Sequence, residues 1–357
     1  MAEGQGQVGH VVARQRMGVG TALFALMDAL ARVSRAMYPP HLPALAASLD
    51  QPAADLREVD RGAFLPDAAT LALRARDGLH AAVDADNPML AAYRALRLYQ
   101  RALALLVEAE SDPDVSQFLL PASHRADNAL AARLARPGPS GTGVSHHAND
   151  LTERGGFSLY VPPSLDLDKP APVVVALHGG SGHGRLFLSN WVPLARLQGV
   201  IVVAPTAIGS TWSLMEPHID VENIGAILDR VAGRWPIDAG RMLLTGMSDG
   251  GTFTLLSGLD DAAPFTHLAP FAASFHPMLL AMAEPRRMAG LPVYLAHGAL
   301  DWMFPIGVAR TARRALSAAG AAVTYQEIAD LSHSYPTDAQ DAVLDWFLTV
   351  PAQGARS

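Results

Sequence analysis

Hydrophobic and polar positions follow two different spacings along the chain. Between about residues 18 and 135 the apolar positions recur at helical spacing, as on the buried face of an amphipathic helix. The clearest segment is 87–110, where Asn87 is suited to cap the first turn. Segments 70–85 and 123–135 show the same pattern, and prolines punctuate the region. The pattern predicts a helical amino-terminal part.

From about residue 157 short apolar runs alternate with amphipathic stretches. The runs rich in Val, Ile and Leu are predicted strands: 173–177, 200–204, 242–245, 291–296 and 322–328. The stretches between and after them are predicted helices: 186–198, 221–235, 252–259, 308–319 and 339–350. Continuous apolar strands that alternate with helices favour a mostly parallel, doubly wound α/β sheet covered on both faces. The active site of such a sheet lies outside the carboxyl ends of its strands.

A segment rich in proline, glycine and serine separates the two patterns. We predict a linker at 136–150, after a helical domain at 1–135 and before an α/β domain at 151–357. The helical domain could be a cap over the site, an oligomer interface or structural support. The second role would make the protein a homo-oligomer.

Composition narrows the classes of function. The chain of 357 residues is 50% apolar, has a net charge of −7 and contains no cysteine. Disulfides, thiolate-bound zinc and cysteine nucleophiles are therefore excluded, and the lack of a basic run argues against nucleic-acid binding. The first apolar stretch, 17–30, carries Asp28, so it does not form a basic segment followed by a long uncharged core, and we expect no signal peptide and a cytoplasmic location. No apolar run is long enough to predict a membrane span.

The strongest chemical signal is a G-x-S-x-G pattern at Gly246-Met247-Ser248-Asp249-Gly250, between a predicted strand and a predicted helix. Such a turn projects the serine hydroxyl above the sheet, and larger side chains at the glycine positions would clash. The alternative is a glycine-rich turn with an idle serine. The surrounding strand and helix favour Ser248 as a nucleophile.

The strand at 173–177 opens into a glycine-rich loop, His178-Gly-Gly-Ser-Gly-His183. Acyl transfer places negative charge on a carbonyl oxygen, which fixed backbone N–H groups stabilise. We predict the N–H groups of Gly180 and Asp249 as donors, with Ser181 as the substitute for Gly180. A phosphate-binding loop would need a lysine followed by Ser or Thr, and a metal site would need a third ligand beside the two histidines. No cofactor or metal is expected.

Two further residues follow predicted strands in the order typical of an acid and a base. Asp301 lies just past 291–296, and His333 lies in the loop after 322–328. The carboxylate could fix the tautomer of the histidine, which would then accept the serine proton. Asp301 could instead cap the next helix, and Asp330 is a rival acid. The chain order Ser248, Asp301, His333 favours the first assignment.

Other residues in the predicted site loops could contact a substrate. His276, which follows a strand expected at 268–275, could line the site. Trp212, Met247 and Trp302 could line an apolar pocket, and ordinary core packing is an equally good interpretation of each. A pocket of this kind suits small or medium acyl esters, or aromatic ones.

With these residues assigned, the segment from about 155 to 350 resembles the α/β-hydrolase superfamily, most closely its carboxylesterase/phospholipase and poly(3-hydroxybutyrate) depolymerase-like branches. The resemblance rests on Leu177 to Gly180, Ile237-Asp238, Gly246 to Gly251, His297-Gly298 with Asp301, and His333. It implies a serine hydrolase that needs no cofactor and cleaves carboxylic esters through an acyl-enzyme. The helical part and the absence of cysteine depart from those branches and favour a small-molecule ester over a polymer as the substrate. A peptidase or thioesterase with the same triad, or a non-catalytic binding protein on this fold, is the alternative.

Overall fold

The computed structural model describes residues 3–59, 62, 64–281, 283–337 and 339–352. The chain divides into two compact units, Met1–Leu119 (unit 1) and Leu120–Ser357 (unit 2). Within the described residues, no helix is both long and apolar enough to cross a membrane.

Unit 1 is helical, as the sequence predicts. Its helices are α1 (Glu3–Arg35), α2 (Leu42–Ala47), α3 (Asp50–Glu58), α4 (Pro66–Val83), α5 (Pro88–Glu108) and α6 (Pro113–Phe118), with a 3-10 turn at Pro39–His41. The Asn87 side chain accepts a hydrogen bond from the Leu90 N–H at 3.1 Å and caps α5 as expected. A Cβ atom on Gly78 of α4 would lie 2.9 Å from the Cβ of Ala95 in α5, so the glycine lets these helices pack closely.

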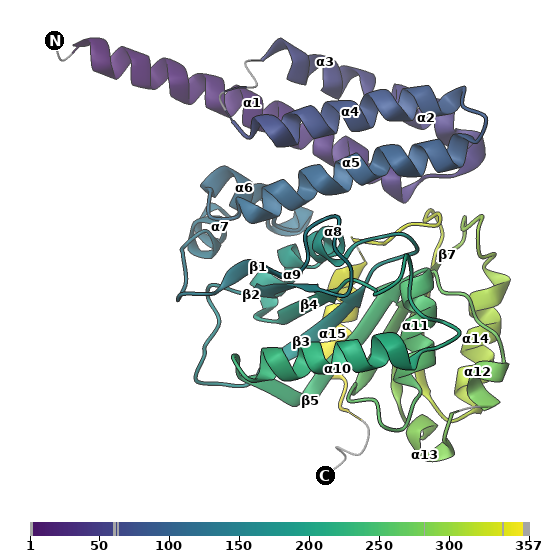
Figure 1. Cartoon of the computed structure of the whole chain (residues 1–357). Coiled ribbons are helices and arrows are strands. Elements are labelled where there is room, and N and C mark those ends of the chain that lie inside the picture. The colour runs from purple at the N-terminus through teal and green to yellow at the C-terminus, as the bar shows by residue number, and fades with distance from the viewer. Residues whose placement is uncertain (1–2, 60–61, 63, 282, 338, 353–357) are drawn as a thin grey trace. The chain divides into compact units, whose positions relative to one another are not determined.

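Unit 2 is built on one mixed sheet (Figure 1). Its strands are β1 (Gly143–His147), β2 (Phe157–Val161), β3 (Ala171–Leu177), β4 (Ile201–Pro205), β5 (Ile237–Met247), β6 (His267–Phe271), β7 (Pro292–Gly298) and β8 (Ala322–Ile328). The order across the sheet is β1-β2-β4-β3-β5-β6-β7-β8. Strand β2 pairs antiparallel with both β1 and β4, and the strands from β4 to β8 are parallel. The predicted α/β class is therefore confirmed.

Helices cover both faces of this sheet. They are α7 (Asn128–Leu134), α8 (Gly184–Phe187), α9 (Val192–Gln198), α10 (His218–Ala232), α11 (Asp249–Gly258), α12 (Met278–Ala281), α13 (Pro285–Met288), α14 (Gly307–Ala318) and α15 (Gln340–Thr349), with 3-10 turns at Ala122–His124 and Leu188–Asn190. Val173, Val175 and Leu177 of β3 share one apolar cluster with α10, α11 and α14. The intervening Val174 and Ala176 are also fully buried, and α9 and α15 lie on that opposite face (Figure 1).

The boundary between the units differs from the prediction. The structure divides the chain after Leu119 rather than after residue 135. Helix α7 belongs to unit 2 because its apolar residues pack against Leu120 and Leu197. Strand β1 lies inside the predicted linker at 136–150 and extends the sheet by pairing with β2. The glycine- and proline-rich composition of this segment concealed an edge strand, whose five residues are all only half-buried.

Candidate active site

Ser248 joins β5 to α11 in a backbone conformation that side chains rarely adopt. Its φ and ψ are 55° and −119°, outside the regions that most non-glycine residues occupy. A Cβ atom on Gly246 would lie 2.5 Å from the backbone of Gly250. A Cβ atom on Gly250 would lie 2.5 Å from the backbone oxygens of Leu177 and His178. Glycine at both positions is thus the steric condition for this turn.

Three side chains from separate loops form a hydrogen-bonded relay beyond the carboxyl ends of β5, β7 and β8. Ser248 Oγ lies 3.0 Å from His333 Nε2, and His333 Nδ1 lies 2.9 Å from Asp301 Oδ2. The three residues are 8%, 3% and 5% exposed, respectively. When Asp301 accepts the Nδ1–H of His333, Nε2 carries no proton and can accept the proton of the serine hydroxyl. The relay can therefore convert the Ser248 hydroxyl into a nucleophile.

The Asp301 carboxylate is held by more than the relay. Its Oδ1 accepts the N–H groups of Met303 and Phe304 at 2.9 and 2.8 Å, and Nε2 of His297 lies 3.2 Å from its Oδ2. Burial acts to raise the pKa of Asp301, but the hydrogen bonds from His297, His333 and the Phe304 N–H outweigh burial and hold that pKa well below its usual value. The Asp301 carboxylate therefore stays ionised. By accepting the Met303 and Phe304 N–H groups, it also holds the loop in which it lies. His297, one of the residues on which the family resemblance rests, lies beside this carboxylate, and its Nε2 is also 2.7 Å from the Phe304 carbonyl oxygen.

The loop of residues 178–182, called the glycine loop below, follows β3 beside Ser248. Within the described part of the chain, neither the Gly180 N–H nor the Asp249 N–H has a hydrogen-bond acceptor. The Ser181 N–H, in contrast, already donates to the carbonyl oxygen of Ser210 at 3.1 Å. Asp249 is the first residue of α11, whose amino-terminal end carries partial positive charge. This geometry favours Gly180 and Asp249 over Ser181 as donors to an oxyanion.

His178 fixes the glycine loop with both ring nitrogens. The Nδ1–H donates to the carbonyl oxygen of Gly179 at 2.7 Å, and Nε2 accepts the Ala207 N–H at 3.1 Å. Burial lowers the pKa of His178 to about 3, so the ring is neutral and can hold both bonds. The Trp212 ring packs between His178 and Phe253, and its Nε1–H donates to the carbonyl oxygen of His178 at 2.7 Å.

A carboxylate stands beside the predicted oxyanion donors. Oδ2 of Asp249 accepts a 2.6 Å hydrogen bond from the Thr211 hydroxyl. A Cβ atom on Gly180 would lie 2.7 Å from the same oxygen, so a side chain at position 180 would displace this carboxylate. The sequence pattern contained no signal for Thr211, because its contact with the motif spans a separation of 38 residues.

Residues 220–349 match the model of the phospholipase/carboxylesterase family. The matched segment includes Ser248, Asp301 and His333 and begins after the glycine loop. This match agrees with the order and direction of the strands. Unit 2 has an α/β-hydrolase fold.

Several known proteins are similar to parts of this chain. A bifunctional acetylxylan esterase/xylanase from Neocallimastix patriciarum is 28% identical over 151 residues, which are 41% of this chain and only 22% of that relative. The crystal structure of a thermostable esterase is 19% identical with a TM-score of 0.47, over 57% of this chain and 62% of that chain. A fluorophosphonate-binding serine hydrolase F from Staphylococcus aureus is 15% identical with a TM-score of 0.47, over 60% and 100% of the two chains. The fold assignment rests on the family match and the sheet, not on these partial alignments.

The residues predicted to line the substrate pocket occupy different surroundings in unit 2. Met247, next to the serine, and Trp302, next to the acid, are half-buried. His276 is exposed, and its Nδ1 accepts the Met278 N–H at 3.2 Å. Trp212 is only 2% exposed and belongs to the core. Its position beneath the glycine loop favours a role in holding that loop. Substrate contact by the other three stays a prediction.

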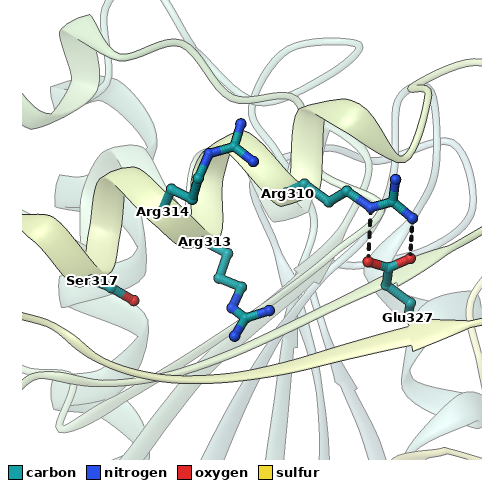
Figure 2. A pocket seen from close by; sticks show the side chains of 5 residues that line it. All are labelled: Arg310, Arg313, Arg314, Ser317 and Glu327. Atoms are coloured by element: carbon teal, nitrogen blue, oxygen red, sulfur yellow. Dashed lines mark hydrogen bonds and ion pairs between the residues drawn. The ribbon is translucent and has the colours of Figure 1, made fainter.

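A surface pocket of unit 2 lies between α14 and the edge strand β8, and it contains none of the relay residues (Figure 2). Its lining residues are Arg310, Arg313, Arg314, Ser317 and Glu327. Arg310 forms a two-point contact with Glu327 at 2.9 and 2.8 Å. The Arg313 guanidinium lies 5.1 Å from the centre of the Tyr325 ring, and Arg314 donates to a threonine of its own helix. Each of these three guanidinium groups therefore has a local partner, and that of Arg310 is a carboxylate.

Proposed function

We propose that the chain is a carboxylic ester hydrolase with Ser248 as nucleophile, His333 as general base and Asp301 as the residue that orients the base. His333 Nε2 takes the hydroxyl proton as Ser248 Oγ attacks the ester carbonyl. The alcohol leaves with that proton, and an acyl-enzyme remains. Water then attacks the acyl group while His333 takes its proton and returns it to Ser248.

The observation that carries this proposal is the continuous 3.0 and 2.9 Å relay that ends on a serine in a strained turn. A structural serine needs neither the unusual backbone nor a histidine held by a carboxylate. The N–H groups of Gly180 and Asp249, which have no acceptor within the described residues, support a role in stabilising the tetrahedral oxyanion. Losing one such donor typically costs about 3 kcal/mol of transition-state stabilisation.

Small or medium acyl esters, including aromatic ones, are the proposed substrates. The named activity of one relative, acetylxylan esterase, concerns an acetyl ester and supports a short acyl group. The half-buried Met247 and Trp302 beside the relay are suited to an apolar acyl or alcohol group. The Asp249 carboxylate beside the oxyanion donors disfavours acyl groups that carry their own negative charge.

The test is a panel of p-nitrophenyl esters of increasing acyl length, measured beside peptide and acyl-CoA substrates. The wild-type chain is compared with Ser248→Ala and with Ser257→Ala, a matched control. Ser257 is a buried serine of α11, the helix that follows Ser248, and its hydroxyl donates to the Phe253 carbonyl oxygen. We expect ester turnover that falls with acyl length, survives Ser257→Ala and disappears in Ser248→Ala. Ester turnover retained in Ser248→Ala, or turnover confined to peptides or acyl-CoA, would contradict the proposal.

A further inference from the structure

The loop that follows β4, residues 207–213, is tied down along its whole length, and we call it the strap. Each of its residues makes a hydrogen bond to a residue outside it. Both ends are held by the fully buried Asp220 carboxylate, which accepts the Ile208 N–H at 3.0 Å and the Ser213 N–H at 2.8 Å. A surface loop does not need this density of contacts, which indicates that its position matters.

The middle of the strap holds the glycine loop and the start of α11. The strap's Ser210 carbonyl accepts the Ser181 N–H, and its Trp212 ring donates to the His178 carbonyl. Its Thr211 hydroxyl binds Asp249, the residue after the nucleophile. Ser181 is held at a φ of 53°, a left-handed conformation that serine seldom adopts without such support. The strap therefore fixes both segments that carry the predicted oxyanion donors.

Arg154 links the strap to the glycine loop through a single side chain. Its Nε donates to the Gly209 carbonyl oxygen of the strap at 2.8 Å. Its Nη1 donates to the Gly182 carbonyl oxygen, at the end of the glycine loop, at 2.7 Å. Burial lowers the pKa of the guanidinium, although the Asp220 carboxylate acts in the opposite direction. Arginine remains charged at neutral pH all the same, so both hydrogen bonds are charge-assisted.

We propose that Arg154 is a positioning residue for oxyanion stabilisation, which it supports by holding the glycine loop against the strap. This inference rests on the proposed function and adds a determinant that lies outside the matched family segment, in the connection between β1 and β2. Among the residues that the structure describes, the Gly180 N–H has no partner of its own, so its direction is set by its neighbours at 178, 181 and 182. Without Arg154 the loop keeps its place at 178 and 181 but loses its anchor at 182.

The first test compares the full-length wild type with Arg154→Ala and with the matched control Arg185→Ala. Arg185 lies three residues beyond the glycine loop and pairs with the exposed Asp150 at 3.0 Å. A displacement of about 1 Å in a reacting geometry can cost about 10²-fold in rate, so we expect Arg154→Ala to lower kcat by about that factor with little change in KM. Affinity for a trifluoromethyl ketone, which occupies the oxyanion site, should fall in parallel. Millimolar guanidinium chloride should restore part of the rate in Arg154→Ala and none in Ser248→Ala.

Amide hydrogen exchange provides a readout that does not depend on turnover. We expect exchange within 178–182 and 207–213 to be faster in Arg154→Ala than in Arg185→Ala. Equal exchange and equal kcat in the two variants would overturn the inference, as would a loss confined to KM. If Arg154→Ala fails to fold, Arg154→Lys provides the decision, because one ammonium cannot reproduce the two-point contact. A folded lysine variant with wild-type kcat would overturn the inference. Absence of Ser248-dependent ester turnover in the wild type would instead refute the proposed function. The exchange measurement would still test whether Arg154 holds the glycine loop against the strap.

Discussion

Acid should destabilise unit 2 through His178, because the folded protein keeps this ring neutral. Burial lowers its pKa from 6.5 to about 3. Between those two pH values the unfolded chain binds a proton that the folded chain cannot bind, so stability falls as pH decreases. The limiting slope is about 1.4 kcal/mol per pH unit. Integrated from pH 7 to pH 4.5, the loss of unfolding free energy amounts to roughly 2 to 3 kcal/mol. This loss is nearly the same for any pKa of the folded-state ring below about 4.

The perturbation is His178→Gln, which removes the titrating ring and keeps a polar side chain that can accept the Ala207 N–H. We expect the variant to be less stable than the wild type at pH 7, because the bond to the Gly179 carbonyl is lost. The difference in unfolding free energy between the two proteins should then shrink by roughly 2 to 3 kcal/mol on going to pH 4.5.

Urea unfolding followed by tryptophan fluorescence is the suitable assay, because all five tryptophans lie in unit 2. They are Trp191, Trp212, Trp235, Trp302 and Trp346. His124→Gln, at an exposed position of the same unit, is the control for loss of a histidine. If His178→Gln and the wild type lose stability in parallel between pH 7 and pH 4.5, the reasoning about a neutral, doubly bonded His178 is refuted.

Two other predictions concern the relay and the turn. Asp301→Asn should lower kcat by about 10⁴-fold, because an amide no longer selects the histidine tautomer that leaves Nε2 unprotonated; steady-state kinetics on a folded preparation measures this, and a loss below about tenfold would contradict it. Gly250→Ala should destabilise unit 2 by about 3 kcal/mol or more, because the new Cβ atom would lie 2.5 Å from backbone oxygens at the end of β3. An unchanged midpoint of thermal unfolding would count against this steric account.

The sheet could be predicted from the sequence because its central strands are buried on both faces. A strand of this kind is a continuous apolar run, and the predicted 173–177 lies within the central strand β3, where all five residues are fully buried. Strand β1 has no such run, because it lies at the edge of the sheet and its polar side chains bond across to β2, as His146 does to Ser158 at 2.7 Å. The predicted helix 186–198 is divided into α8, a 3-10 turn and α9 because Pro193 starts a new helix.

The candidate site was predictable where local sterics fix the residue type. Gly246 and Gly250 are required by the turn around Ser248, so a pattern of five residues, placed between a predicted strand and a predicted helix, indicated the candidate nucleophile. The strap was not predictable, because Thr211 and its neighbours belong to no motif. The contacts of the strap reach residues 7 to 55 positions away in sequence, including Arg154. Such contacts follow from the tertiary fold and leave no spacing that can be recognised in one sequence.

Covalent labelling of the full-length chain with a fluorophosphonate, read by peptide mass spectrometry, tests the relay most directly. We expect a single adduct, on the peptide that carries Ser248. In His333→Ala this adduct should form at least about 10³-fold more slowly. Labelling of another residue, or an unchanged labelling rate in a folded His333→Ala variant, would contradict the assignment of these two residues.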